Sequence, residues 1–146
     1  MITVLLVDDH VAIRNSLQYL IEKSDAIQVV ATASNGIEAV AHAGSRCPDI
    51  IVMDISMPQM DGIEATRQIL LLCELTRVLM RSTYDTSDHI RRALEVGANG
   101  YVLKDTVAND MLDGIRTLSV DKHYFSQRIA EIAEKVLLER NNSWLA

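Results

Sequence analysis

The stretch IIVMD at residues 50–54 is a run of four aliphatic side chains that ends in a single carboxylate, Asp54. Short apolar runs at residues 2–7, 78–80 and 101–103 are followed in a similar way by polar or charged groups. Uninterrupted apolar runs of this length are typical of strands buried on both faces of a parallel sheet. The groups that follow these runs are the carboxylates Asp8 and Asp9, the hydroxyl of Ser82 and the ammonium of Lys104.

The apolar runs alternate along the chain with segments whose apolar residues recur at helical spacing. Five such strand–helix units predict an α/β fold: a doubly wound, five-stranded parallel sheet of order 2-1-3-4-5, with helices on both faces. Ser34 is the expected cap of the second helix, and Asp105 or Thr106 that of the fifth. The third helix should begin at Asp61, with Glu64 three residues further on. The predicted strands are residues 2–7, 27–33, 49–54, 77–82 and 100–103.

Residues 121–146 follow a different pattern from these units. Ser126 can cap a further helix in which Ile129, Ile132 and Val136 share one face. The polar residues 141–143 should end this helix, and no strand follows it. We therefore divide the chain into a domain at residues 1–120 and a linker or interaction helix at residues 121–146.

In this strand order the first and third strands are neighbours at the switch point of the sheet, where open α/β folds bind ligands. Asp8, Asp9 and Asp54 should therefore converge. Three crowded carboxylates repel one another unless a cation lies between them, so the pattern predicts a divalent-metal site. A reactive aspartate accompanied by the hydroxyl of Ser82 and the ammonium of Lys104 can move a phosphoryl group.

Composition argues against several other classes of function. A net charge of −6 without basic clusters speaks against a nucleic-acid or membrane surface. The first residues show no signal-peptide pattern and no apolar run has the length of a membrane span, so we expect a cytoplasmic protein. Cys47 and Cys73 lack the spacing of a zinc site, and we expect them to be buried free thiols.

Three motifs together resemble the receiver domain of bacterial two-component response regulators. They are LLVDDH at residues 5–10, VMDISMPQMDG at residues 52–62 and GANGYVLKD at residues 97–105. The resemblance covers about residues 1–120, and its last motif is similar to the NarL/LuxR-type subfamily. In that subfamily a linker and a DNA-binding helix-turn-helix follow the receiver, whereas this sequence stops at Ala146, so we expect the output domain to be absent.

The resemblance implies a role for each residue of the site. Asp54 is the implied phosphoacceptor, and Ser82 and Lys104 contact the phosphoryl group. Ser82 and Tyr101 form the implied conformational switch. The implied ligands of Mg²⁺ are Asp8, Asp9, Asp54 and the backbone carbonyl of Ser56.

The resemblance also implies partners. A sensor histidine kinase should supply the phosphoryl group, and a phosphorylation-dependent homodimer is possible. The full-length parent should bind DNA and regulate transcription, whereas this fragment should not bind DNA. The chain should not be an enzyme beyond its own phosphorylation and dephosphorylation.

Other interpretations of these residues stay open at the level of sequence. Ser82 could be a turn residue, and Tyr101 an ordinary surface tyrosine. The alternative function is a haloacid-dehalogenase-like Mg²⁺-dependent phosphatase, although that class needs a carboxylate where Ser56 stands. A flavodoxin-like cofactor binder is disfavoured because Asp8 would repel a phosphate there. Arg81 departs from the receiver pattern, which is apolar at this position, and we expect it to end the fourth strand early or to face solvent.

Overall fold

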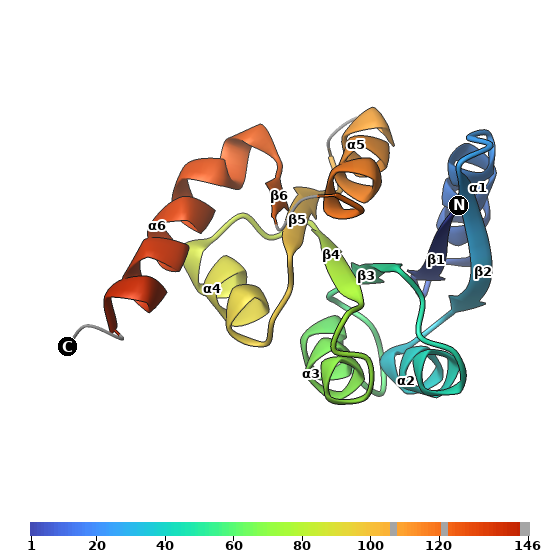
Figure 1. Cartoon of the computed structure of the whole chain (residues 1–146), viewed down its shortest axis with the longest axis horizontal. Coiled ribbons are helices and arrows are strands. Elements are labelled where there is room, and N and C mark those ends of the chain that lie inside the picture. The colour runs from blue at the N-terminus through green and yellow to red at the C-terminus, as the bar shows by residue number, and fades with distance from the viewer. Residues whose placement is uncertain (106–107, 121–122, 144–146) are drawn as a thin grey trace.

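A single parallel sheet runs through the molecule, which a computed structural model describes at residues 1–105, 108–120 and 123–143. The strand order β2-β1-β3-β4-β5 confirms the predicted topology, and a short strand that the sequence did not indicate, β6, extends the β5 edge (Figure 1). The strands are β1 Ile2–Val7, β2 Ile27–Ala33, β3 Ile50–Asp54, β4 Arg77–Ser82, β5 Gly100–Leu103 and β6 Tyr124–Phe125.

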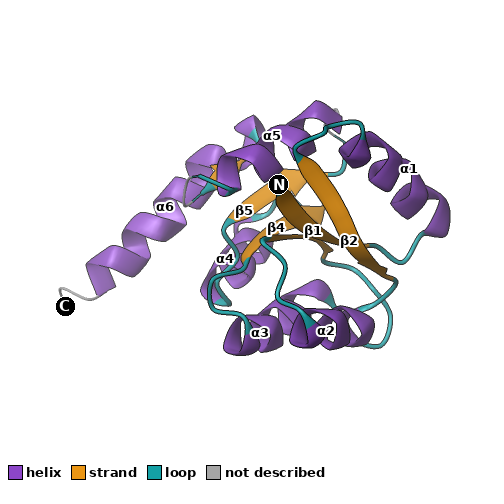
Figure 2. Ribbon diagram, turned by 45° about the vertical axis from the view of Figure 1, so that its right-hand side comes forward, coloured by secondary structure: helices purple, strands orange, loops and turns teal. Residues whose placement is uncertain are grey.

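Helices cover both faces of the sheet, with α1 and α5 on one side and α2, α3 and α4 on the other (Figure 2). None of the described helices combines the length and the apolar character needed to cross a bilayer. The helices are α1 Val11–Glu22, α2 Gly36–Ser45, α3 Gly62–Leu72, α4 Ser87–Glu95, α5 Ala108–Leu118 and α6 Gln127–Ser143.

The helix caps agree with the sequence in α3 but not in α2. The Asp61 side chain accepts a hydrogen bond from the Glu64 N–H, as predicted. Asn35, and not Ser34, caps α2, because its side chain accepts from the Glu38 N–H at 2.9 Å while the Ser34 hydroxyl bonds the Glu38 carboxylate. The predicted caps of α5 cannot be compared, since residue 106 lies outside the described residues.

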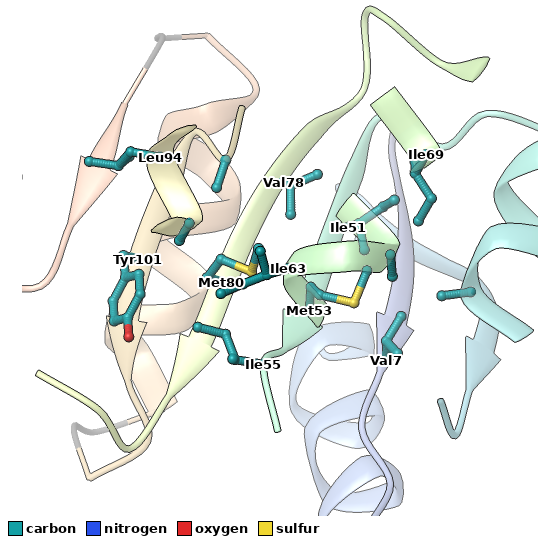
Figure 3. Close-up of a cluster of buried hydrophobic side chains, with 14 of the residues drawn as sticks. Val7, Ile51, Met53, Ile55, Ile63, Ile69, Val78, Met80, Leu94 and Tyr101 are labelled. Atoms are coloured by element: carbon teal, nitrogen blue, oxygen red, sulfur yellow. The ribbon is translucent and has the colours of Figure 1, made fainter. Parts of the chain in front are cut away.

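Aliphatic side chains fill the two layers between the sheet and its helices, as the low aromatic content predicts. Alternate residues of each strand point to opposite faces, so neighbouring positions of one strand belong to different layers. Figure 3 shows Met53, Ile63 and Met80 close together in the layer between the sheet and α2, α3 and α4, with Tyr101 at one side. The other layer joins Leu6, Val52, Leu79 and Val102 to α1 and α5.

The last helix packs against the rest of the molecule. Ile129, Ala133 and Val136 are buried in the same layer as α4, and Ile132 is partly buried. The apolar face predicted for this helix therefore covers the domain itself. The predicted end of the helix at residues 141–143 is wrong, because α6 continues to Ser143.

The two cysteines form a disulfide, so the prediction of free thiols is wrong. Cys47 follows the end of α2 and Cys73 follows the end of α3, and their Cα atoms lie 5.6 Å apart. The two helices pack side by side, and this contact brings together residues that are 26 positions apart in sequence. Cys73 is buried as expected, whereas Cys47 is exposed.

We expect no free thiol in the unfolded, unreduced protein and two after reduction, measured by alkylation and intact mass. Reduction should also lower the melting temperature, because closing a loop of this length is worth about 3 kcal/mol of unfolded-state entropy. Cys47→Ser in the absence of reductant should show the same loss. Two reactive thiols in the unreduced protein would contradict the bond.

Gly62→Ala should destabilise the fold, because a Cβ at this position would lie 2.1 Å from the backbone oxygen of Asp54. Backbone atoms cannot rotate away from the added Cβ. We therefore expect the free energy of unfolding, measured in urea, to fall by about 2 kcal/mol. Gly44→Ala is the matched control: its Cβ would lie 3.5 Å from a Leu72 methyl group, an ordinary contact, and should be neutral or slightly stabilising. Equal unfolding midpoints for both variants would contradict the close packing behind Asp54.

Candidate functional site

The carboxyl ends of the central strands bring the predicted site residues to one edge of the sheet. Asp54 is the last residue of β3, which lies between β1 and β4. Asp8 and Asp9 directly follow β1, and Lys104 follows β5. Lys104 reaches across β4, and its Nζ lies 2.8 Å from Asp54 Oδ1.

The carboxylates of Asp8, Asp9 and Asp54 form an acidic cluster whose ligand atoms, with one nitrogen of His10, all lie within 4.8 Å of one another. Asp54 Oδ2 is buried and has no hydrogen-bond partner in the described part of the chain, and the buried Asp9 Oδ1 has only the His10 ring nitrogen beside it, at 3.1 Å. An unpaired buried carboxylate oxygen is costly, and a hard cation with oxygen ligands would satisfy both atoms. The donor set therefore fits Mg²⁺.

Burial raises the pKa of Asp54, while the hydrogen bond and charge of Lys104 lower it and the charges of Asp8 and Asp9 raise it further. The Asp54 side chain is only 1% exposed, so it sits in a medium that strengthens all of these interactions. The Ser56 N–H lies 3.3 Å from Asp54 Oδ1 and donates to it. Ser56 itself is exposed, on the loop after β3, next to the acidic cluster.

Ser82 and Tyr101 are linked through the backbone of Tyr84. The Tyr84 N–H donates to Ser82 Oγ at 3.0 Å, and the Tyr101 hydroxyl donates to the Tyr84 carbonyl at 2.6 Å. Tyr101 is fully buried beside α4, so the alternative of a surface tyrosine is wrong, and this burial raises its pKa. Ser82 is buried at the end of β4, where the sequence placed it.

An open pocket of about 460 Å³ adjoins the acidic cluster. Asp9 and Ser56 line one side of it, and Tyr84, His89 and Arg92 line another. The Tyr84 ring stacks on the His89 ring, with centroids 4.1 Å apart. A phosphorylated group has room to approach the buried acidic cluster from this side.

Two basic residues that were not predicted as site residues contact the acidic cluster. The largely exposed His10 holds its Nδ1 3.1 Å from Asp9 Oδ1, an ion pair when the imidazole is protonated. Arg14 of α1 donates to the backbone carbonyl of Asp8 at 2.8 Å. The signal in the sequence was position: His10 directly follows the Asp8-Asp9 pair, and Arg14 lies about one helical turn further on.

The expectation that Arg81 ends β4 early or faces solvent is wrong. β4 continues through Ser82, and the Arg81 side chain turns toward the acidic cluster, where Nη1 lies 3.2 Å from Asp8 Oδ2. Burial lowers the pKa of Arg81, and the charges of Asp8 and Asp54 raise it. A guanidinium keeps its proton in proteins, so the site contains a second fixed cation beside Lys104.

Comparison with known proteins places this geometry in a family. Residues 4–116 match the family model of the response regulator receiver domain. The chain is 37% identical over 128 residues to the response regulator protein VraR of Staphylococcus aureus, an alignment that covers 88% of this chain and 61% of VraR. The chain thus spans about three fifths of the length of the curated relatives it matches.

Solved structures give the same result. A LuxR-family two-component response regulator from Aurantimonas sp. superposes with a TM-score of 0.84 at 32% identity, covering 97% of this chain and 99% of that one. The signal receiver domain of NarL from Mycobacterium tuberculosis gives a TM-score of 0.75 at 28% identity, covering 81% of this chain and 95% of that one.

These likenesses do not support the haloacid-dehalogenase-like phosphatase. The family match extends over all three sequence motifs, and the relatives include regulators of the LuxR type, as the resemblance implied. The chain therefore belongs to the response regulator receiver domain family.

Proposed function

We propose that this receiver domain accepts a phosphoryl group on Asp54 from a sensor histidine kinase and transmits the change to an output domain. One observation carries the proposal. Of the two oxygens of the buried Asp54 carboxylate, one is paired with Lys104 and the other has no described partner and lies in the acidic cluster. A carboxylate held in this way keeps one oxygen without a protein partner, available to a metal ion or to an incoming phosphorus atom.

The transfer forms a bond between a carboxylate oxygen of Asp54 and phosphorus and breaks the bond from phosphorus to the donor, giving an acyl phosphate. Lys104 holds the other carboxylate oxygen and offers positive charge to the transferring oxygens. Bound Mg²⁺, held by Asp8, Asp9, Asp54 and the backbone carbonyl of Ser56, would neutralise the negative charge of the phosphoryl oxygens. Ser82 has a hydroxyl proton to donate to one of them.

Donation by Ser82 also supports a switch. If the Ser82 hydroxyl moves toward the phosphoryl group, its hydrogen bond from Tyr84 is lost, and the Tyr84 carbonyl that holds the Tyr101 hydroxyl is free to move. Tyr101 is buried in the same layer as α4 and α6, so a displacement of its ring would change how α6 packs. Phosphorylation then acts by shifting a small two-state equilibrium.

Helix α6 is attached to both loops that flank the site. Arg128 forms ion pairs with Asp105, after β5, and with Asp85, after β4, at 2.7 and 3.3 Å. The Ser126 hydroxyl accepts from the Leu103 N–H and donates to Asp110 of α5. These contacts support a role for residues 121–146 as the linker between the receiver at residues 1–120 and an output domain.

The properties of the full-length parent belong to the same proposal. The VraR relatives are longer than this chain, and one structural relative is a LuxR-family regulator. We infer a cytoplasmic, DNA-binding transcription regulator that can dimerise on phosphorylation. The domain itself would catalyse only its own phosphorylation and dephosphorylation. It should therefore not turn over a generic phosphomonoester.

Incubation with acetyl phosphate and Mg²⁺ should add one phosphoryl mass to the chain, because Asp54 alone combines burial, Lys104 and the acidic cluster. Intact-mass spectrometry should show no adduct with Asp54→Asn, with Asp9→Ala or in excess chelator. Asp25→Asn, a carboxylate away from the site, is the control and should be labelled normally. Undiminished labelling of Asp54→Asn would refute the assignment.

Beryllofluoride with Mg²⁺, as a mimic of the phosphoryl group, should change amide exchange in α6 and shift sedimentation toward a dimer. Tyr101→Phe removes the hydroxyl that donates to the Tyr84 carbonyl and interacts with Ser82, so it should reduce both responses while its ring stays buried. Tyr19→Phe makes the same chemical change on the exposed side of α1 and serves as control. Identical exchange and sedimentation of the parent with and without the mimic would exclude the coupling.

A further inference from the structure

A basic residue on a central strand points into the acidic cluster. Arg81 lies directly opposite Asp54 in the register of β3 and β4. Residues at alternate positions share a face of the sheet, so Arg81 lies on the same face as Leu79, toward α1 and α5. Its side chain is only 14% exposed, and it ends at Asp8, whose side chain is 1% exposed.

The three carboxylates of the cluster are not equally satisfied. Both oxygens of Asp8 have protein partners: Oδ1 accepts from the His10 N–H at 2.8 Å, and Oδ2 accepts from Arg81 at 3.2 Å. Asp54 Oδ2 has no hydrogen-bond partner among the described residues, and Asp9 Oδ1 faces only the His10 ring nitrogen, at 3.1 Å. Arg81 therefore already neutralises one member of the set that is proposed to hold the metal ion.

We propose that Arg81 is an internal cation that competes with Mg²⁺ for the acidic site, lowers the affinity of the site for the metal ion and stabilises the metal-free protein. The inference rests on the Mg²⁺ site of the proposed function. Arg81 is in this sense a residue that sets metal affinity, and not a ligand of the metal.

Two effects of the guanidinium oppose Mg²⁺. It occupies a carboxylate oxygen that a metal ion, or a water on that ion, would otherwise use, and Mg²⁺ needs a nearly complete octahedron of oxygens. It also places a fixed positive charge within a few ångströms of a divalent ion in a poorly solvated site, where such repulsion is strong. Removal of the charge should tighten Mg²⁺ binding by about tenfold or more.

The metal-free protein should respond in the opposite direction. Arg81 and Lys104 are the permanently charged cations paired with the three carboxylates among the described residues. Without Arg81, only Lys104 would remain. Their mutual repulsion is then stored in the metal-free fold. A variant without the charge should have a lower melting temperature than the parent in chelator. Its melting temperature should rise more than that of the parent in saturating Mg²⁺, because a ligand that binds only the native state raises stability.

The experiment measures the dissociation constant of Mg²⁺ alone by calorimetry, with melting curves in chelator and in saturating Mg²⁺. Arg81→Met keeps an apolar stem of similar length and removes the charge. Arg46→Met is the matched control, because Arg46 is exposed beyond α2, before the amino end of β3, and its loss changes the net charge equally. Asp9→Ala, which removes a proposed metal ligand, gives the calorimetric signal expected without the metal site.

Arg81→Met should bind Mg²⁺ at least about tenfold more tightly than the parent, and Arg46→Met should bind like the parent. Equal or weaker binding by Arg81→Met refutes the competition, and equal Mg²⁺ affinity with weaker beryllofluoride binding would assign Arg81 to the phosphoryl group instead. If Arg81→Met does not fold without metal, Arg81→Gln, which keeps hydrogen-bonding groups without charge, gives the same test.

The outcomes also separate this inference from the function on which it rests. Saturable Mg²⁺ binding that is lost in Asp9→Ala but is equal in the parent and Arg81→Met refutes the role of Arg81 alone. No saturable binding in any of the variants refutes the metal site, and the competition with it.

Discussion

Repulsion among Asp8, Asp9 and Asp54 is the constraint around which the functional edge of this molecule is arranged. The parallel sheet brings these carboxylates together because β1 and β3 are neighbours whose carboxyl ends lie side by side. Their charges must be compensated in a poorly solvated place. Lys104 compensates Asp54 from β5, and Arg81 compensates Asp8 from β4, so every strand of this part of the sheet contributes to the balance.

The same edge explains how a local chemical event can reach a distant surface. Ser82 ends the strand beside Asp54, and one backbone segment connects its hydroxyl to the Tyr101 ring. Beyond that ring, α4 and α6 share a buried layer, and Arg128 ties α6 to the loops that follow β4 and β5 (Figure 1). In the proposed function, these contacts connect the phosphoryl group at this edge to a helix that is paired with two adjacent loops.

Sequence patterns predicted the five central strands, their order and the start of α3 because each depends on local periodicity and on general rules of chain connection. The placement of Asp8, Asp9 and Asp54 at one edge followed from the same rules. Competition between neighbouring groups was not predictable: Asn35 and Ser34 can both cap α2, and in the structure Asn35 accepts from the Glu38 N–H while Ser34 bonds the Glu38 carboxylate. The strand β6 was missed because two residues carry no periodic signal.

The sequence by itself determined the fold class and the set of reactive groups, since strand ends in a parallel sheet must meet. Only the tertiary structure decided which groups pair. The contact between α2 and α3 joined Cys47 to Cys73, although nothing in their spacing indicated a bond. Strand register turned Arg81 toward Asp8, although a charged residue in a strand is usually solvated. Pairing depends on distances between segments far apart in the chain, and those distances exist only after folding.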